Sequence, residues 1–385
     1  MEEGEIFLTD QREQRATIAL WTLPGVGPRT VGRVRARFGS IAAAIEQDPD
    51  AIVPELPSAA RPFANRLARS EQIANEVLGS TESIGGQIVF EGAPGWPRQL
   101  TGVPDAPPLL FVRGSLSPAG ARVGIVGARK TDDYGQQVSS YLGRELAAAG
   151  VGIVSGGAIG VDSAAHAAAV EVGQTTVVLG CGVDVVYPRL NRKLFDRILM
   201  HGGALVSTFP PRTPPCEQNF PVRNRVLAAL CDALVVTRAG RESGALMTAR
   251  AAHKLGRPVL GVSGRIGEEQ SRGVTLLIRD GVAIPADGPE DILKALGRPS
   301  SARSSAPRRT APSRPPIPPQ YQRVMAVLEA GPSQMDEIAA ASGLTIPALA
   351  SALTELEMLG LCEVRLGGLF AATGGPEFDC ATEPV

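Results

Sequence analysis

The sequence is poor in the residues that build metal sites and disulfide frameworks. It has 3 histidines and 5 cysteines in 385 residues, and no two cysteines form a CxxC pair. An odd number of scattered cysteines argues against a disulfide framework, and so few histidines leave little for a zinc site. We therefore expect no metal, no other cofactor and a reducing, cytoplasmic environment.

An excess of one charge and long apolar runs are also missing. Lys and Arg number 38 and Asp and Glu 39, which gives a net charge of -1, so any site for a polyanion has to be local. The first residues, MEEGEIFLTDQREQR, contain no apolar leader core, and no uninterrupted apolar run is long enough to span a bilayer. We expect no membrane association.

The length favours two or three domains, because a single core seldom serves so long a chain. Residues 297–320 are rich in Pro, Ser and Arg and cannot bury enough apolar area to order themselves, so they read as a flexible linker. The linker is either a plain spacer or a non-specific nucleic-acid contact. The linker contains no acidic residue, and its positive charge comes from Arg298, Arg303, Arg308, Arg309 and Arg314. The other expected segments are a helical domain at 1–80, an α/β domain at 81–296, a winged helix at 321–373 and a tail at 374–385.

The α/β domain alternates apolar, β-branched runs with helical patterns. Strands with little apolar–polar alternation are covered on both faces, which predicts a Rossmann-like, doubly wound sheet. The runs are RVGIVGA, VGIVSGG, TTVVLGCG, GALVSTF, ALVVTRA and RPVLGVSG. Ligands of such sheets bind beyond the carboxyl ends of the strands, where the Gly-rich turns collect. The first turn, GARK, lacks the GxGxxG spacing of dinucleotide binders, so it indicates a different phosphate.

These turns supply the candidate anion-binding residues. An arginine after a strand-end glycine can grip a phosphate with two hydrogen bonds, and small residues before a helix allow a phosphate close approach to backbone N–H groups. The tripeptide RNR at 223–225 suits a sugar-phosphate track better than a catalytic centre. The predicted nucleic-acid-binding residues are Gly127, Arg129, Lys130, Ser155, Gly156, Gly157, Arg189, Asn191, Lys193, Arg223, Asn224, Arg225, Ser243, Gly244 and Thr248.

Structural explanations compete with this interpretation. Gly156 and Gly157 could serve only tight turns, and one arginine of the RNR tripeptide could pair with an acidic residue. His166 follows Asp162 by four residues, a spacing that fits a structural contact better than a catalytic pair. Cys181 lies between two glycines, but no general base can be assigned beside it. We expect no catalytic residues.

The N-terminal segment carries LPGVG at 23–27 between two helical patterns, which resembles the helix-hairpin-helix motif of non-specific DNA binders. Gly25 and Gly27 would leave backbone N–H groups facing a phosphate. Positive charge recurs on one helical face at Arg29, Arg33 and Arg37. A plain packing unit is the alternative, so DNA contact here is a secondary expectation.

Residues 321–373 read as helix, helix, turn, helix and a two-stranded wing, with Gly343 at the turn. This order predicts a winged helix. The recognition-helix segment IPALASALTELEMLG contains two glutamates and no Lys or Arg, so it would repel duplex phosphates. A protein contact or an autoregulatory role is the preferred interpretation.

Six motifs in order resemble the DNA-processing protein A family (DprA, also called Smf). They are VGIVGAR, IVSGGAIGVDSAAHAAA, GCGVDVVYPRLNRKL, FPVRNRVLAAL, SGALMTARAAHKLGRPVLGVSG and GVTLLIRDGV, and the resemblance covers roughly residues 87 to 290. It implies a cytoplasmic protein that binds and protects incoming single-stranded DNA and loads RecA recombinase onto it in natural transformation and recombination. It also implies a homodimer formed through the Rossmann-like domain.

The chain departs from the family pattern at several positions. Ile159 replaces an arginine, Thr208 a glutamate, and Thr275 an asparagine, while Ser263 stands where a proline is usual. These changes put the strength of DNA, RecA or dimer contacts in question.

Two alternative functions remain open. A nucleoside monophosphate phosphoribohydrolase would need PGGxGTxxE, but the corresponding RAGRESGALMTA has Glu242 before the Ser-Gly, at the wrong spacing. A protein–protein adaptor with weakened DNA binding is the other alternative. A dinucleotide-dependent dehydrogenase is disfavoured because its fingerprint is missing.

Overall fold

The structure is a computed structural model that describes residues 10–117, 120–298, 317–331, 333–359, 361–365 and 369–372. The chain divides into two compact units, Met1–Ser300 and Ser301–Val385. Most of the expected linker at 297–320 and all of the expected tail at 374–385 lie outside the described residues.

The first unit begins with a helical segment whose hairpin was expected. Gly25, with φ of +71°, turns the chain between the first two helices, as LPGVG predicts. Asp10 and Ser40 cap the first and third helices by accepting hydrogen bonds from backbone amides. The elements are α1 (Gln11–Trp21), α2 (Pro28–Phe38), α3 (Ile41–Gln47), η1 (Pro49–Glu55), η2 (Arg61–Arg69) and α4 (Ser70–Ser83).

A nine-stranded sheet follows, in the order β1-β2-β6-β5-β4-β3-β7-β8-β9. Strands β3 to β9 pair in parallel, and β1 and β2 add an antiparallel edge. All six expected strands are present, and the doubly wound prediction is confirmed. The strands are β1 (Gly86–Phe90), β2 (Leu109–Gly114), β3 (Arg122–Val126), β4 (Gly152–Ser155), β5 (Thr175–Leu179), β6 (Ala204–Ser207), β7 (Ala233–Val236), β8 (Val259–Val262) and β9 (Ile284–Ala286).

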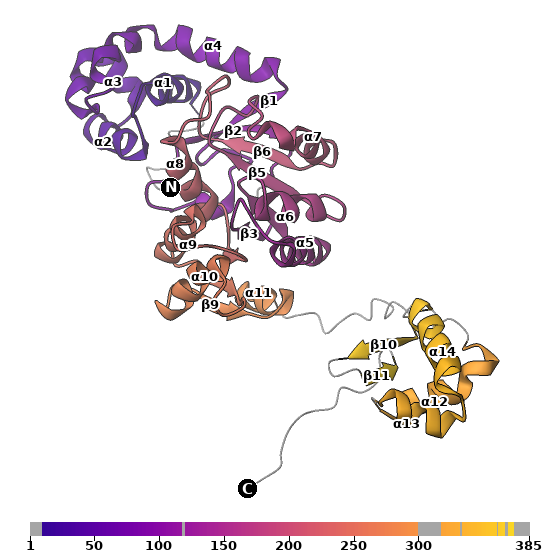
Figure 1. The fold of residues 1–385 in the computed structure, drawn as a ribbon. Helices are drawn as coiled ribbons and strands as arrows, with labels where there is room; N and C mark the ends of the chain where they lie inside the picture. Colours follow the sequence, from indigo (N-terminus) through magenta and orange to yellow (C-terminus); the bar gives the residue numbers. More distant parts are fainter. Residues whose placement is uncertain are drawn as a thin grey trace. The chain divides into compact units, whose positions relative to one another are not determined.

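Helices cover both faces of this sheet (Figure 1). Their apolar residues join two separate clusters, one with α5, α6 and α11 and one with α8, α9 and α10, while α7 packs on β5 and β6. The helices are η3 (Arg98–Leu100), α5 (Asp133–Ala148), α6 (Val161–Ala169), η4 (Arg189–Asn191), α7 (Arg192–Met200), α8 (Asn219–Ala229), α9 (Gly244–Lys254), α10 (Glu269–Arg279) and α11 (Pro289–Ala295).

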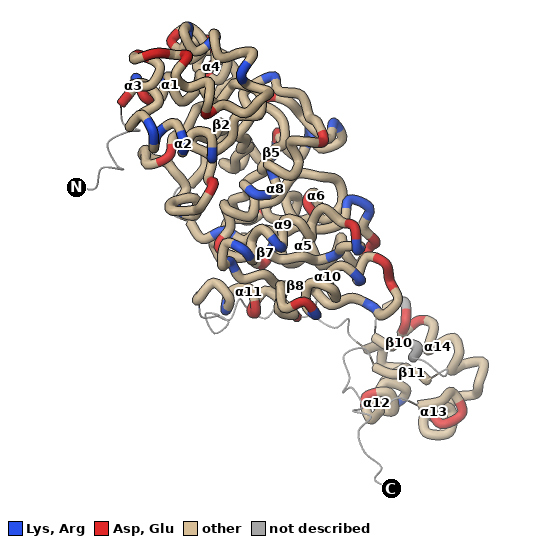
Figure 2. The backbone as a smooth tube through the Cα atoms, turned by 90° about the vertical axis from the view of Figure 1, so that its left-hand side faces the viewer, with Lys and Arg blue, Asp and Glu red and all other residues tan. Residues whose placement is uncertain are grey.

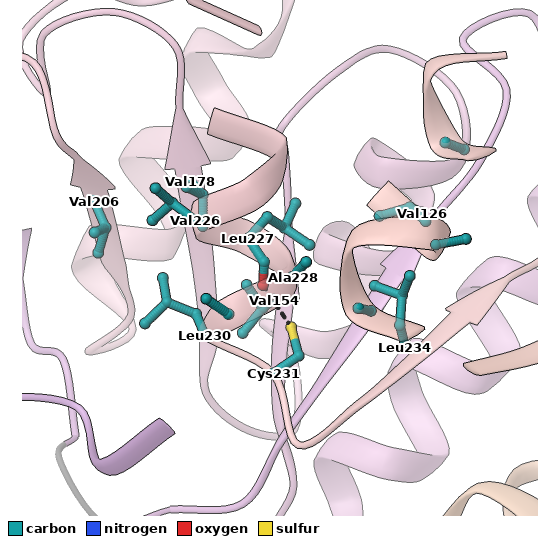
Figure 3. Close-up of a cluster of buried hydrophobic side chains, with 14 of the residues drawn as sticks. Val126, Val154, Val178, Val206, Val226, Leu227, Ala228, Leu230, Cys231 and Leu234 are labelled. Atoms are coloured by element: carbon teal, nitrogen blue, oxygen red, sulfur yellow. Dashed lines mark hydrogen bonds between the residues drawn. The ribbon is translucent and has the colours of Figure 1, made fainter. Parts of the chain in front are cut away.

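Helix α8 is anchored in the larger cluster. Its residues from Val226 onward pack on valines from β3, β4, β5 and β6, as Figure 3 shows. Cys231, just beyond the helix, is fully buried and donates from Sγ to the carbonyl of Leu227 at 3.0 Å. Burial of this end fixes the helix, and with it the position of its polar first turns.

The helical segment is not independent of the sheet. Ile18 and Ala74 share a buried cluster with Phe90 and Phe111 of the antiparallel edge strands. The indole Nε1 of Trp21 donates to the carbonyl of Thr208 at 2.7 Å. The boundary expected at residue 80 falls within α4, and both parts belong to one compact unit.

The second unit is a winged helix, as expected. Its elements are η5 (Pro319–Tyr321), α12 (Gln322–Ala330), α13 (Met335–Ser342), α14 (Ile346–Met358) and the antiparallel pair β10 (Cys362–Arg365) and β11 (Leu369–Ala372). Gly343 ends α13 in the left-handed conformation, φ +76°. In the described residues no single helix is long and apolar enough to cross a membrane. Helices α13 and α14 have sufficient length and apolar character only when taken together, and the angle between them is 104°.

Candidate nucleic-acid interface

The loops after β3, β4 and β7 are bonded to one another at the carboxyl edge of the sheet. The amide of Ala128 donates to the carbonyl of Arg238 at 2.7 Å, and the amide of Val161 donates to the carbonyl of Ala128 at 3.3 Å. Lys and Arg segments lie near the labels α8 and β7 in Figure 2. Because β3 lies between β4 and β7, this edge contains the point where the strand order reverses, which is the usual ligand position in such sheets.

Arg223 projects from α8 onto the loop after β4. Its guanidinium lies against the α-carbon of Gly156, where a β-carbon would overlap Nη1. The residue is only 8% exposed, and its Nε has no hydrogen-bond partner among the described residues. Gly156 is therefore needed for the close approach of a buried cation, a reason beyond the tight turn considered from sequence.

Asp162, in the first turn of α6, is bonded to the same loop after β4. Its carboxylate accepts hydrogen bonds from the amides of Gly156 at 3.0 Å and Ala158 at 3.3 Å. Burial raises the pKa of Asp162, while the charge of Arg223 and these amides oppose the rise. Asp162 is thus an acidic neighbour whose charge acts on Arg223, but the two side chains form no ion pair among the described residues, so the expected pairing of one RNR arginine with an acidic residue is not found.

Phe220, at the start of α8, has three side chains around its ring. The Cζ atoms of Arg129 and Arg223 lie 5.3 and 5.9 Å from its ring centroid. The Tyr187 ring lies 5.9 Å from the same centroid, tilted by 38°. Both distances to the guanidinium groups are within cation–π range, so this single ring organises the two arginines. We call Arg129, Tyr187, Phe220 and Arg223 the phenylalanine site.

The two arginines repel each other. Burial lowers the pKa of Arg223, and the neighbouring positive charge of Arg129 lowers it further, although Asp162 raises it. Arg129 itself is exposed. A phosphate that contacts both guanidinium groups would relieve this repulsion and gain charge-assisted hydrogen bonds.

Several predicted residues have internal roles instead. Ser155 is fully buried and donates from Oγ to the carbonyl of Ile125 at 2.5 Å. Asn191 is 8% exposed and donates from Nδ2 to the Gly157 carbonyl and to Ser163 Oγ, both at 2.8 Å. Gly127 has no room for a side chain, because a β-carbon would lie 2.6 Å from Val161. These residues hold the loops in position rather than offering free polar groups.

The other predicted residues differ in their exposure. The exposed residues are Lys130, Arg189, Lys193, Arg225 and Gly244, while Gly157 and Thr248 are buried and Asn224 is half-buried. Ser243 is the N-cap of α9, and its side chain accepts from the Ala245 amide at 3.3 Å. The structure confirms that a helix begins at Gly244. The role of these residues in binding stays a prediction.

Asp162 and His166 have separate internal partners and form no hydrogen bond or ion pair with each other among the described residues, so the structural contact expected between them is not found. His166 Nδ1 lies 2.6 Å from Thr175 Oγ1, and burial lowers the pKa of the imidazole to about 3. Cys181 is buried, which raises the pKa of its thiol to about 11, so it is not activated as a nucleophile.

The basic stripe of α2 is already paired. Arg29 forms an ion pair with Asp105 at 3.0 Å, while Arg33 and Arg37 both pair with Glu55, at 3.3 and 2.8 Å. These contacts neutralise much of the charge that suggested DNA binding by the hairpin, and the packing alternative gains support from them.

Arg238 was missed by sequence reasoning. It follows β7 at the strand-order reversal, is 1% exposed, and pairs with Asp132 and Glu268, the latter at 2.7 Å. It also donates to Ser271 Oγ at 2.7 Å. Its side chain therefore lies beside Asp132, the N-cap residue of α5, at the strand-order reversal. Phe220 was missed as well; its only signal was its place directly before the proline that precedes RNR.

Two of the family departures take part in hydrogen bonds through their backbone carbonyls. The carbonyl of Thr208 accepts from Trp21 and that of Ser263 accepts from Tyr134 Oη at 3.3 Å. Ile159, in the loop after β4, is 45% exposed, and Thr275 Oγ1 donates to the Ser271 carbonyl at 3.0 Å.

Comparisons with known proteins agree with the fold. The sequence profile described as "DNA recombination-mediator protein A" matches residues 87–297, and "DprA winged helix domain" matches 307–368. Protein Smf of Escherichia coli K12 is 35% identical over 277 residues, 71% of this chain and 74% of its own length. Protein Smf of Synechocystis is 28% identical and spans 92% of this chain and 98% of its own.

Two solved structures of DNA processing protein A are also similar. That of the Streptococcus pneumoniae protein is 28% identical, covers 74% of this chain and 98% of its own, and has a TM-score of 0.59. That of the Helicobacter pylori protein, described for its single-stranded DNA binding mode, is 29% identical, covers 55% and 95%, and has a TM-score of 0.50. The profile match over residues 87–297 and the 35% identity to Escherichia coli Smf show that this chain belongs to the DNA recombination-mediator protein A family.

Proposed function

We propose that this protein binds single-stranded DNA at the phenylalanine site, protects the strand and loads RecA recombinase onto it during transformation and recombination. The observation that carries the proposal is the contact of the two guanidinium groups of Arg129 and Arg223 with the ring of Phe220. The description of the Helicobacter pylori relative as a single-strand binder supports it.

The site chemistry favours an unpaired strand. Phe220 is only half-buried, and Tyr187 is 41% exposed, so an unstacked base can reach an aromatic face that bases of a duplex cannot. The arginines would hold the adjoining phosphates. Stacking and phosphate contact are tolerant of sequence, so binding should depend strongly on salt and little on base identity.

The protein partners belong to the same proposal. We infer a homodimer formed through the Rossmann-like domain, with RecA as the partner that receives the strand. The winged helix serves protein contact: Glu355 and Glu357 are exposed on α14, and Glu355 accepts from Tyr321 Oη. Negative charge on this helix opposes duplex phosphates.

A non-catalytic role is proposed over hydrolysis of nucleoside monophosphates. Arg238 and its carboxylate partners occupy the strand-order reversal, and the Cys181 thiol and His166 imidazole are buried in forms unsuited to catalysis. Strand binding needs no group that gains or loses a proton in a reaction.

The test compares a fluorescent oligothymidine with a duplex of equal length across a salt series. The intact protein should prefer the single strand, and Arg129→Gln should weaken binding about tenfold and reduce the salt dependence. Absence of binding at low salt would overturn the proposal, and hydrolysis of a nucleoside monophosphate by the purified protein would favour the enzyme. A shortened lag in RecA-driven strand exchange tests the loading role separately.

A further inference from the structure

A second group of arginines surrounds a hollow of about 210 Å³ on the other side of the strand-order reversal. The loops after β7 and β8 and the outer face of α10 form its walls. The side chains of Arg241, Arg265, Arg272 and Arg279 line it, and we call these four the second arginine cluster. Ile266, also in the lining, is fully exposed.

The hollow carries excess positive charge. Glu268 is the acidic residue in its lining, but it already accepts from Arg238 at 2.7 Å, and this bond lowers the pKa of the carboxyl. Arg272 pairs with Glu269 at 2.9 Å. Among the described residues, the exposed side chains of Arg241 and Arg265 make neither a hydrogen bond nor an ion pair, although Arg265 is near enough for its charge to help lower the pKa of the Glu268 carboxyl. Two cations at the rim of a hollow are therefore available to an anion.

The cluster and the phenylalanine site share one edge of the sheet. Strands β4, β3, β7 and β8 are consecutive neighbours in parallel, so the loops that follow them emerge on the same side. Three strand spacings separate β4 from β8, about 14 Å, a span of a few nucleotides. The bond from the Ala128 amide to the Arg238 carbonyl joins the intervening loops.

We propose that the second arginine cluster binds backbone phosphates of the same single strand that occupies the phenylalanine site, so that the strand crosses the strand-order reversal. This inference rests on the proposed function. Arg241 and Arg265 contact the phosphates, the Thr275 side chain is exposed beside them, and Ile266 offers an apolar surface to an unstacked base. The footprint is then longer than the phenylalanine site alone requires.

The experiment uses the full chain and two oligothymidines, about 6 and about 20 nucleotides long. The variant is Arg241→Gln with Arg265→Gln. The matched control removes the same charge at Arg66→Gln with Arg144→Gln; both of these arginines are exposed, on η2 and in the later turns of α5. Substitution by lysine at 241 and 265 retains the charge, and circular dichroism verifies folding.

The glutamine variant should bind the long strand about fivefold more weakly and lower its salt slope by about 1.4, or 0.7 for each lost phosphate contact, while the short strand binds as before. The lysine variant should restore the slope. Equal effects on both strands, an equal effect of the control, or no effect on the long strand would overturn the inference. A changed sedimentation coefficient in the variant would instead assign the cluster to contact between copies. If the unchanged protein binds neither strand, the proposed function itself fails.

Discussion

The Arg223 guanidinium lies directly on the α-carbon of Gly156, so the loop after β4 can keep its shape only while residue 156 has no side chain. The two residues are 67 positions apart in the sequence and come from a strand end and a helix start. Their contact couples the conformation of the loop to the position of a buried cation beside Phe220.

Gly156→Ala should therefore displace Arg223. We expect single-strand affinity to fall about tenfold and the free energy of unfolding to fall by about 1–3 kcal/mol from overpacking. Oligothymidine titration and urea unfolding measure the two effects. Gly152→Ala, at the first residue of β4, is the control, since a β-carbon there meets its nearest neighbours at an ordinary 3.5 Å. Equal affinity in the two variants would contradict the coupling.

Phe220→Leu should weaken single-strand binding by about 1–3 kcal/mol, because it removes the aromatic surface for one base and the cation–π contacts of two arginines. Duplex binding at low salt should change little. Fluorescence anisotropy with both ligands gives the comparison. Phe63→Leu, at a 42% exposed phenylalanine of η2, is the matched control and should leave affinity unchanged. A ratio of single-strand to duplex affinity that is the same in both variants would exclude stacking on Phe220.

Stability should decline in mild acid because of His166. Burial lowers its pKa to about 3 in the folded protein, while an unfolded chain has about 6.5, so the unfolded state takes up a proton first. The contribution is intact above pH 6.5 and is lost as the pH falls toward 3, with a slope approaching about 1.4 kcal/mol per pH unit. Urea unfolding between pH 7 and 5 measures it.

The variant His166→Asn should flatten that slope and retain a polar group for Thr175. His253→Gln, at an exposed position of α9, should keep the slope of the unchanged protein. If His166→Asn preserved the full slope, the acid sensitivity would have to come from other groups.

Arg238→Met should lower the free energy of unfolding by about 2 kcal/mol. The substitution leaves Asp132 and Glu268 without their shared cation, but both carboxylates are about one-third exposed, so water reduces the penalty below that of a fully buried pair. Chemical denaturation measures the loss. The exposed Arg272→Met, which breaks only a surface pair with Glu269, should cost about 0.5 kcal/mol or less. Comparable losses of unfolding free energy in the two variants would show that the buried Arg238 pairs stabilise the protein no more than a surface ion pair does.

Much of the architecture followed from local patterns. The valine-rich runs specify strands covered on both faces, and a left-handed Gly343 between two helical patterns specifies the turn of a winged helix. Arg129 was predicted from its place after a strand-end glycine. The antiparallel strands β1 and β2 were not predicted, because their pairing joins segments whose partners are distant in sequence.

The sequence did not predict which residues of the loops at the carboxyl edge of the sheet are free to bind a ligand, because neighbouring residues in one turn face different surroundings. Asn191 and Lys193 are two positions apart, yet the first is enclosed by backbone carbonyls and the second is exposed. The stripe at Arg29, Arg33 and Arg37 looked free because its carboxylate partners lie elsewhere in the chain.

The sequence by itself determined the class of fold, the order of the strands along the chain and the family, because hydrophobic periodicity and glycine-marked turns act over short stretches. Only the tertiary structure decided which cations are available. It seated Arg223 on Gly156 beside Phe220, placed Arg238 between two carboxylates and gathered four arginines around a hollow. The reason is physical: charge and burial depend on neighbours in space, and those neighbours come from strands that meet only when the sheet is complete.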